Sequence, residues 1–307
     1  MQKIINSTDF RKMVSSGARM LEINRAKVDA LNVFPVPDGD TGTNMSLTMQ
    51  SAITEMNACS SNRFQEICDA VSKGALRGAR GNSGVILSLL FRGLAKRLKG
   101  VEKADAKLYA AAMSDGVDAA YKAVMKPAEG TILTVSRVST SSAVEFAEHG
   151  SDLELMISCA IESATEALAD TINLNPVLAR AGVVDAGGKG YVFILEATLS
   201  VLRGEAYAPE VQPNKGGAFE VNEHADFAAF SPDEIEFAYD TVYIVRKNGE
   251  PLEPLRIYLE SIGDSLVISE DDEVFKVHVH TNIPGHALTE SQKYGELEVA
   301  KIENMRI

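Results

Sequence analysis

Apolar residues recur at helical spacing through the first two thirds of the chain. Ser7, Thr8 or Asp9 can cap a first helix, because the apolar positions that follow share one helical face. These positions are Phe10, Met13, Val14, Ala18 and Leu21. The same period predicts helices near residues 43–57, 64–76, 83–98, 106–125, 130–147, 151–170 and 187–203. About eight helices joined by short loops predict an all-α helical bundle or barrel over residues 1–203.

The pattern changes after residue 203. Residues 204–232 are polar and acidic, with Pro209, Pro213 and Pro232, and predict a linker. Beyond it, apolar alternation predicts strands at 239–245, 265–269, 274–281 and 297–302, with helices at 254–262 and 284–294. The order β-α-β-β-α-β predicts a small α+β domain over residues 233–307, a split-βαβ sandwich of ferredoxin-like type.

Composition narrows the class of protein. With 45% apolar and 24% charged residues the chain is ordinary globular protein, and its net charge of −13 argues against nucleic acid and anionic membranes as partners. Cys59, Cys68 and Cys159 form no CxxC pair, which suits a reducing compartment. No signal peptide is apparent, and no apolar run approaches the roughly 18–20 residues of a membrane span. We therefore expect a cytoplasmic protein without a transmembrane segment.

Residues 35–46 read Pro-Val-Pro-Asp-Gly-Asp-Thr-Gly-Thr-Asn-Met-Ser and carry the clearest chemistry. Asp38 and Asp40 can hold a hard cation through oxygen, and Mg²⁺ commonly binds one or two carboxylates together with substrate phosphate. Thr41, Thr43 and Asn44 follow directly, at the expected start of a helix that would favour an anion. Taken alone, the same residue types also form an ordinary turn.

Two further glycine-rich segments could approach a phosphate. Residues 77–84, Arg-Gly-Ala-Arg-Gly-Asn-Ser-Gly, place Asn82 and Ser83 before an apolar helix, where they can cap it and leave its N-terminus open to an anion. A plain helix connection explains this loop equally well. Residues 182–190 fail as a Walker loop, because Gly188 stands where lysine is needed and Gly190 where Ser or Thr is needed.

Four segments together resemble one family. They are residues 32–45 (Asn-Val-Phe-Pro-Val-Pro-Asp-Gly-Asp-Thr-Gly-Thr-Asn-Met), 78–88, 121–135 and 182–190, in that order. This arrangement resembles the dihydroxyacetone-kinase L-type domain, and more closely the kinase subunit of bacterial fatty acid kinase. The resemblance covers residues 5–203 strongly, and a weaker match around residues 277–282 extends it to the end.

The resemblance implies an ATP-dependent phosphotransferase that uses Mg²⁺. Asp38 and Asp40 would be catalytic metal ligands, with Asp29 as the third. A further set would bind the nucleotide: Thr41, Thr43, Asn44, Asn82 and Ser83 around the phosphates, with Gly130, Thr131, Asp185 and Gly187 closing over it. The implied acceptor is a fatty-acid carboxylate, which is ionised at neutral pH and needs no general base.

A second metal site is predicted in the C-terminal part. His278 and His280 are two apart on a strand, so both rings face one way and can form half of a zinc site. Two solvent-facing polar residues are the alternative. In the family that the chain resembles, a cysteine joins these histidines as a zinc ligand; the matching position here is Asp240, which weakens the expected site. His286 is a poor substitute.

The resemblance also implies partners. The acyl chain would be presented by a separate fatty-acid-binding protein. The sequence does not give the oligomeric state and leaves a homodimer open. Longer family members carry a further C-terminal domain, so the chain is either a truncated piece or a short member. Two alternatives stay open: a kinase for a small polyol such as dihydroxyacetone, and a non-catalytic nucleotide-binding module.

Overall fold

The structure is a computed structural model that describes residues 4–205, 225 and 235–306. Within residues 4–205 the chain forms nine α-helices and one short ribbon of two strands. The helices are α1 (Ser7–Asp29), α2 (Thr41–Ala58), α3 (Phe64–Gly78), α4 (Gly81–Arg97), α5 (Ala106–Ala123), α6 (Ile132–His149), α7 (Leu153–Leu174), α8 (Pro176–Ala181) and α9 (Ala186–Leu202). The ribbon pairs β1 (Ile4–Ile5) with β2 (Ala104–Asp105). The predicted all-α architecture is confirmed, and most of the predicted linker at 204–232 lies outside the described residues.

Two helix starts differ from the sequence-based expectation. The N-cap of α1 is Asn6, whose side chain accepts from the N–H groups of Thr8 and Asp9, while the Asp9 carboxylate accepts from the N–H of Asn6. This reciprocal capping box uses a residue one position before those proposed as caps. The short helix α8 was not predicted separately; Asn175 caps it and Pro176 occupies its first position, where a missing N–H costs nothing.

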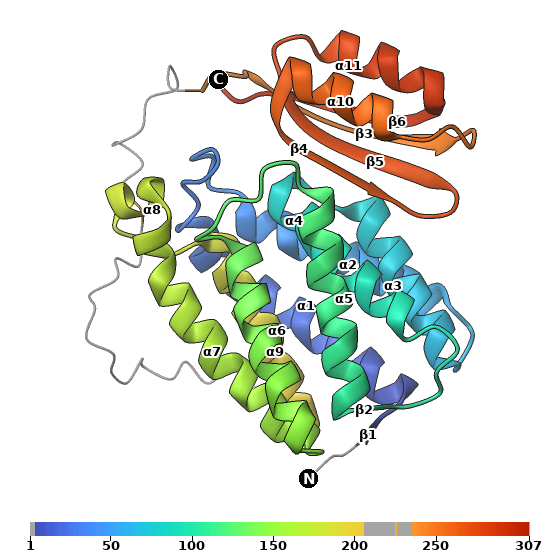
Figure 1. Cartoon of the computed structure of the whole chain (residues 1–307), viewed down its shortest axis with the longest axis vertical. Coiled ribbons are helices and arrows are strands. Elements are labelled where there is room, and N and C mark those ends of the chain that lie inside the picture. Colours follow the sequence, from blue (N-terminus) through green and yellow to red (C-terminus); the bar gives the residue numbers. More distant parts are fainter. Residues whose placement is uncertain (1–3, 206–224, 226–234, 307) are drawn as a thin grey trace.

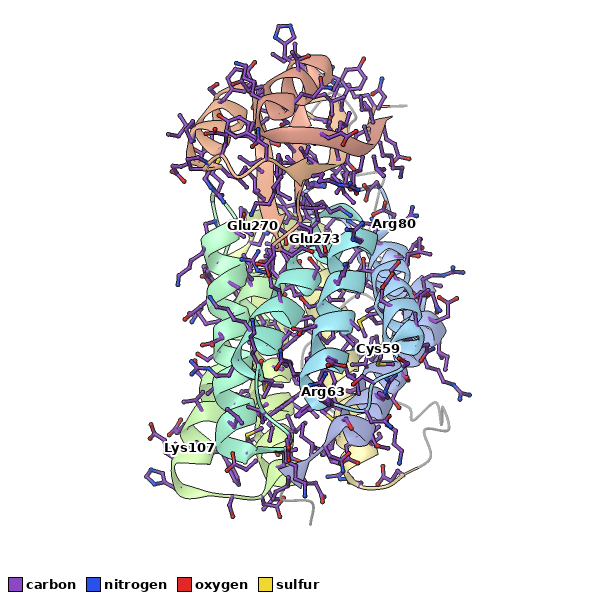
Figure 2. The ribbon with its side chains drawn as sticks, turned by 90° about the vertical axis from the view of Figure 1, so that its right-hand side faces the viewer. Cys59, Arg63, Arg80, Lys107, Glu270 and Glu273 are labelled. Atoms are coloured by element: carbon purple, nitrogen blue, oxygen red, sulfur yellow. The ribbon has the colours of Figure 1, made fainter. Side chains whose placement is uncertain are left out.

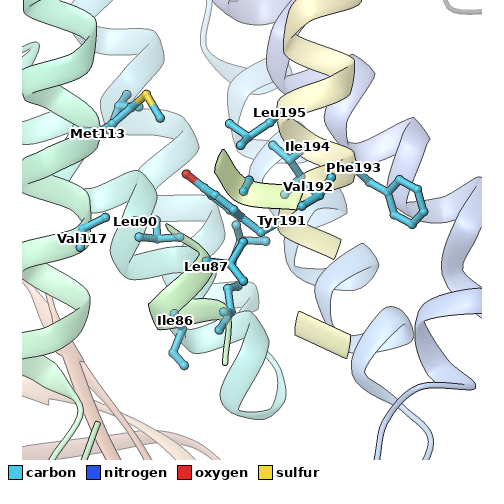
Figure 3. Packing of buried hydrophobic residues seen from close by; sticks show 14 of the residues in the cluster. Ile86, Leu87, Leu90, Met113, Val117, Tyr191, Val192, Phe193, Ile194 and Leu195 are labelled. Atoms are coloured by element: carbon cyan, nitrogen blue, oxygen red, sulfur yellow. The ribbon is translucent and has the colours of Figure 1, made fainter. Parts of the chain in front are cut away.

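Helix α9 lies largely inside the bundle, and its sequence is apolar on most sides, with Lys189 and Glu196 half-buried. It contacts α1, α2, α6 and α7. Figure 3 shows Tyr191 extending between Leu87 and Leu90 of α4 and Met113 of α5, while Phe193 points to the opposite side. A helix surrounded by others in this way has little polar surface to present. No helix among the described residues is long and apolar enough to cross a membrane.

The C-terminal part (residues 235–306, the sheet domain) has the predicted topology. Its elements are β3 (Tyr239–Lys247), α10 (Glu253–Ile262), β4 (Gly263–Glu270), β5 (Val274–Thr281), α11 (Pro284–Ser291) and β6 (Gly295–Asn304). The strand order is β4-β5-β3-β6, and every pairing is antiparallel. This order, with both helices on one face, is that of a split-βαβ sandwich.

The two faces of the central strand β5 have different surroundings. Phe275, Val277 and Val279 are fully buried and belong to the core that the sheet forms with α10 and α11. Lys276, His278 and His280 alternate with them and so lie on the other face. Figure 1 shows that this second face is turned towards the end of the helical bundle. The polar residues of β5 are therefore buried between the two parts.

The sheet domain is docked on one end of the bundle through backbone contacts. The N–H of Met125 donates to the carbonyl of Leu266 at 3.3 Å, and Val124 forms an isolated bridge with Val267. Val267 belongs to the core of the bundle rather than to that of the sheet domain. In Figure 2, Arg80 and Glu273 lie where the two parts meet, whereas Lys107 lies at the far end of the bundle. The end that carries residues 35–46 and 78–84 is thus covered by the sheet.

Candidate functional site

Asn32 shapes the loop that carries the two aspartates. Its side-chain oxygen accepts from the N–H of Asp40 at 3.0 Å, and from the N–H and hydroxyl of Thr41 at 2.9 and 2.8 Å. Its amide donates to the carbonyl of Val36 at 3.0 Å, so both the oxygen and the nitrogen of this buried side chain are bonded. Sequence reasoning missed Asn32; the only signal was a lone amide between the apolar residues Leu31 and Val33.

Helix α2 starts directly behind the aspartates but keeps few donors for a ligand. Its N-cap, Asp40, makes no side-chain capping bond. The N–H of Thr41 is taken by Asn32, and the N–H and hydroxyl of Thr43 both donate to Asp29 at 2.9 Å. The structure therefore uses Thr43 and Asp29 to join α1 to α2, and neither lines the cavity described below. A metal-ligand role for Asp29 stays a prediction.

The first turn of α4 has the free donors that α2 lacks. Its N-cap is Arg80, without a side-chain capping bond, so Asn82 and Ser83 lie inside the first turn and do not cap it. Among the described residues no acceptor takes up the N–H groups of Gly81, Asn82 and Ser83. Unsatisfied N–H groups at a helix start, together with the helix dipole, favour an anion. The loop before α2 thus supplies carboxylates to this region, and the first turn of α4 supplies backbone N–H donors.

One cavity joins these elements to the sheet domain. It has a volume of about 40 Å³, which is room for a few water molecules. Of the predicted residues its lining includes Asp38, Asp40, Thr41, Asn44, Asn82, Ser83, Asp240, His278 and His280; Asn32 and Met305 also line it. The tertiary structure therefore brings both proposed metal sites, about 200 to 240 residues apart in sequence, to the same space.

Electrostatics favour a cation in this cavity. Burial, and then the neighbouring Asp40 carboxylate, raises the pKa of Asp38 to about 8. Burial also raises the pKa of Asp40 and of Asp240, and the Asp240 carboxylate contributes further to raising both of the others. Three acids facing one another out of water are mutually unfavourable as anions, and a bound cation reverses this. Such a cluster in a cavity is typical of a functional site.

The histidine pair has the spacing of two zinc ligands. The Nε2 atoms of His278 and His280 lie 3.3 Å apart, and Zn–N bonds of about 2.0–2.1 Å at a tetrahedral angle put two nitrogens about 3.3 Å apart. Together with an Asp240 oxygen, one ligand atom from each residue lies within 4.8 Å of the others. Oδ1 of Asp240 is buried without a hydrogen-bond partner. These residues fit a metal ion.

Asp264 is a further carboxylate beside this pair that sequence reasoning missed. Its Oδ1 lies 3.4 Å from Nδ1 of His280, and Oδ1 of Asp240 lies 3.4 Å from Nδ1 of His278. An irregularity between Asp264 and Val267 in the pairing of β4 with β5, with Ser265 at φ +52°, displaces the strand at this point. A carboxylate on the far nitrogen of a ligating histidine commonly fixes its orientation.

The remaining predicted nucleotide residues form a group next to the cavity. Asp185 caps α9 by accepting from the N–H of Gly188 at 2.7 Å, and it also accepts from the backbone of Ile132. Thr131 is the N-cap of α6 and Gly130 directly precedes it at φ +74°. A Cβ at Gly187 would lie 3.1 Å from the hydroxyl of Ser83, so Ser83 connects this group to the cavity.

Comparison with known proteins identifies the class. The family model described as the DAK2 domain matches residues 35–200, and the chain belongs to this family. The family model described as the FakA-like middle domain of fatty acid kinase matches residues 236–307. The two matches follow one another along the chain and correspond to the bundle and the sheet domain, which confirms the family predicted from the sequence motifs.

Curated relatives extend the match over nearly the whole chain. Uncharacterized proteins of Staphylococcus aureus strains USA300 and N315 are 44% identical over 306 residues, which is 98% of this chain and 56% of theirs. The chain thus spans about half the length of these relatives. Among solved structures, the dihydroxyacetone kinase of C. freundii in its native form matches 64% of this chain and 34% of its own, with 16% identity and a TM-score of 0.49.

Proposed function

We propose that this chain is the nucleotide-binding part of an Mg²⁺-dependent ATP phosphotransferase. The observation that carries the proposal is the shared cavity, in which Asp38 and Asp40 face the open N-terminus of α4. Mg²⁺ held by these two carboxylates would supply positive charge that stabilises the phosphoryl group during its transfer. The family membership supports the same class of reaction.

Each residue of the cavity would have a defined task. Asp38 and Asp40 hold the cation, while the N–H groups of Asn82 and Ser83 bind phosphate oxygens. Asn44, whose side chain hydrogen-bonds the carboxylate of Asp40, orients that acid. Gly130, Thr131, Asp185 and Gly187 close over the nucleotide from the side of Ser83. Asn32 touches no ligand in this scheme and fixes the loop.

The acceptor that we propose is a fatty-acid carboxylate, presented by a separate fatty-acid-binding protein in the cytoplasm. The match of residues 236–307 to a fatty acid kinase middle domain supports it. A carboxylate oxygen would attack the γ-phosphorus of ATP, with ADP leaving and an acyl phosphate forming. No group among the cavity residues is needed as a general base, since the attacking carboxylate is already ionised.

Zinc at His278, His280 and Asp240 is part of the proposal. Zinc bound there would place a positive charge on the sheet-domain side of the cavity. His278 is suited to hold it, because burial, and then His280, lowers its pKa well below the ordinary value and keeps the ring neutral.

Calorimetric titration with ATP and Mg²⁺ tests the metal site. We expect Asp38→Asn and Asp40→Asn each to abolish Mg²⁺-dependent ATP binding while the far-ultraviolet circular dichroism stays that of the wild type. Asp118→Asn, on the exposed surface of α5, is the matched control and should bind as the wild type does. Unchanged affinity in both site variants would refute the metal-site assignment.

Product trapping tests the acceptor. Hydroxylamine converts an acyl phosphate to a hydroxamate. Incubation of the chain with ATP, fatty acid and a fatty-acid-binding protein in the presence of hydroxylamine should therefore yield the hydroxamate and ADP. ADP formed with dihydroxyacetone instead would assign the chain to small-polyol kinases. Tight ATP binding with turnover of neither acceptor would identify a non-catalytic module.

A further inference from the structure

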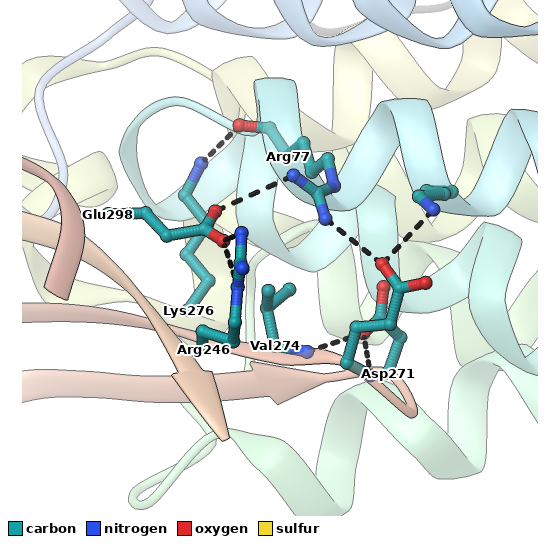
Figure 4. Close-up of polar contacts among 8 residues, drawn as sticks. Arg77, Arg246, Asp271, Val274, Lys276 and Glu298 are labelled. Atoms are coloured by element: carbon teal, nitrogen blue, oxygen red, sulfur yellow. Dashed lines mark hydrogen bonds and ion pairs between the residues drawn. The ribbon is translucent and has the colours of Figure 1, made fainter. Parts of the chain in front are cut away.

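A buried lysine of the sheet domain donates hydrogen bonds to the segment that leads into the first turn of α4. Nζ of Lys276 donates to the carbonyl of Arg77 at 3.2 Å and, by a shorter contact, to the carbonyl of Ala79. Arg77 is in the last turn of α3 and Ala79 is its C-cap. Figure 4 shows this contact beside the ion pairs of the same interface. A residue almost 200 positions away thus binds carbonyls at the C-terminal end of α3.

The burial of Lys276 makes this contact specific. Its side chain is only 4% exposed, and a buried ammonium group is costly unless its donors are paired. The carbonyls at the end of α3 lack helical partners and carry the negative end of the helix dipole, so they suit a cation. The surrounding pairs of Glu273 with Lys73 and Arg77 are largely exposed, and such pairs contribute little.

The same segment, residues 77–81, also contacts α2 on its other side. The N–H of Arg80 donates to the hydroxyl of Thr48 at 3.2 Å, and that hydroxyl donates to the carbonyl of Asn44 at 2.7 Å. Gly81 adopts φ +56°, and a Cβ there would lie 2.6 Å from the Asn44 side chain. A continuous chain of contacts therefore runs from the sheet domain through residues 79–81 to Asn44, which bonds Asp40.

We propose that Lys276 is a positioning residue for the phosphate-binding turn of α4, through which the docked sheet domain holds that turn in register with Asp38 and Asp40. Lys276 touches neither the nucleotide nor the acceptor in this scheme. It acts through the carbonyls of Arg77 and Ala79, which set the start of the turn. The expected effect on ATP binding rests on the proposed function, whereas the contacts of Lys276 with Arg77 and Ala79 do not depend on it.

Amide hydrogen exchange and ATP titration of Lys276→Met test the proposal together. Methionine keeps the length and packing of the side chain and removes its three donors. We expect exchange at the bonded amides of Arg80 and Gly84 to rise about tenfold or more, with exchange in α7 unchanged, because local opening is released without global unfolding. We also expect the affinity for ATP with Mg²⁺ to fall about tenfold, in keeping with the loss of the hydrogen bonds that Lys276 donates.

Matched variants separate positioning from general stability. Lys276→Arg keeps charge and donors and should retain most of the protection and affinity, and Glu273→Gln, which weakens only the exposed pairs, should resemble the wild type. If Lys276→Met fails to fold, the same comparison is made with Lys276→Gln. If the amides of Arg80 and Gly84 exchange at the wild-type rate in the folded variant that lacks the Lys276 amine, the proposal is overturned. If the wild-type chain binds no ATP, the proposed function fails, and the exchange result still decides the role of Lys276.

Discussion

Asp29 at the end of α1 accepts both the backbone N–H and the hydroxyl of Thr43, each at 2.9 Å. Two oxygens of one carboxylate thus replace the side-chain cap that α2 lacks at Asp40. The bond pair fixes the direction in which α2 leaves the Asp38–Asp40 loop. Asp29, for which the family resemblance implies a metal-ligand role, thus also joins two helices.

Removal of the Thr43 hydroxyl should therefore lower stability. Thr43→Val keeps the shape and the N–H bond but loses the hydroxyl bond to a carboxylate, and we expect a loss of about 1–2 kcal/mol in the free energy of unfolding. Thr43→Ser retains the hydroxyl and should lose less than half of that. Urea unfolding followed by circular dichroism measures both, and equal losses in the two variants would contradict the role of the hydroxyl.

Gly42 should tolerate no side chain. A Cβ there would run into the carbonyl of Arg25 and lie 2.9 Å from Cβ of Val28, so α1 and α2 would have to separate. We expect Gly42→Ala to cost about 1–3 kcal/mol, as overpacking of a tight interface does. At Gly285 in α11 an added Cβ would meet no atom within 4 Å, and Gly285→Ala should leave the thermal midpoint unchanged or slightly raised. A mild effect at Gly42 would show that the close approach of α1 and α2 is wrong.

Asp185 should make stability depend on pH. Its burial raises its pKa to about 6, against 3.8 as the ordinary value, while bonds from Gly188 and Ile132 oppose the shift. The folded state then holds a proton that the unfolded state releases, so this group favours folding at low pH, and that contribution is lost as pH rises through about 6. Relative to Asp185→Asn, the wild type should gain about 2 kcal/mol between pH 7 and pH 4.5.

Urea unfolding of both proteins at the two pH values measures this difference. Asp152 caps α7 in a partly exposed position, so Asp152→Asn is the matched control and should differ from the wild type by a similar amount at both pH values. If the difference in the free energy of unfolding between wild type and Asp185→Asn is the same at both pH values, the raised pKa of the buried carboxylate is contradicted.

Asp240→Cys should strengthen zinc binding. A thiolate is a softer and stronger zinc ligand than a carboxylate, and the two histidine nitrogens already have ligand spacing. We expect the zinc affinity to rise about tenfold or more, measured by competition with a chromophoric chelator. His286→Ala should change nothing, whereas His278→Ala should remove binding. No stoichiometric zinc in purified, untreated wild type and none retained by Asp240→Cys would exclude the site.

The sequence by itself determined most of the elements and their order, although not α8 or the ribbon of β1 and β2. Helical spacing of apolar residues gave α1 to α7 and α9 to within a few residues, and strict alternation gave β5 at its observed bounds. These patterns report which face of an element is buried, and that is a local property of the backbone period. The Asp38-Gly39-Asp40 loop and the order of the glycine-rich segments identified the family for the same reason, since both are contiguous in the chain.

Only the tertiary structure decided which polar groups are free for a ligand. Thr43 and Asp29 hydrogen-bond each other at a helix junction, whereas the N–H groups of Asn82 and Ser83 leave the N-terminus of α4 open. The approach of His278 and Lys276 to the helical bundle also depends on docking between distant segments. Hydrogen-bond partners and desolvation arise from packing across long sequence separations, which no local pattern encodes.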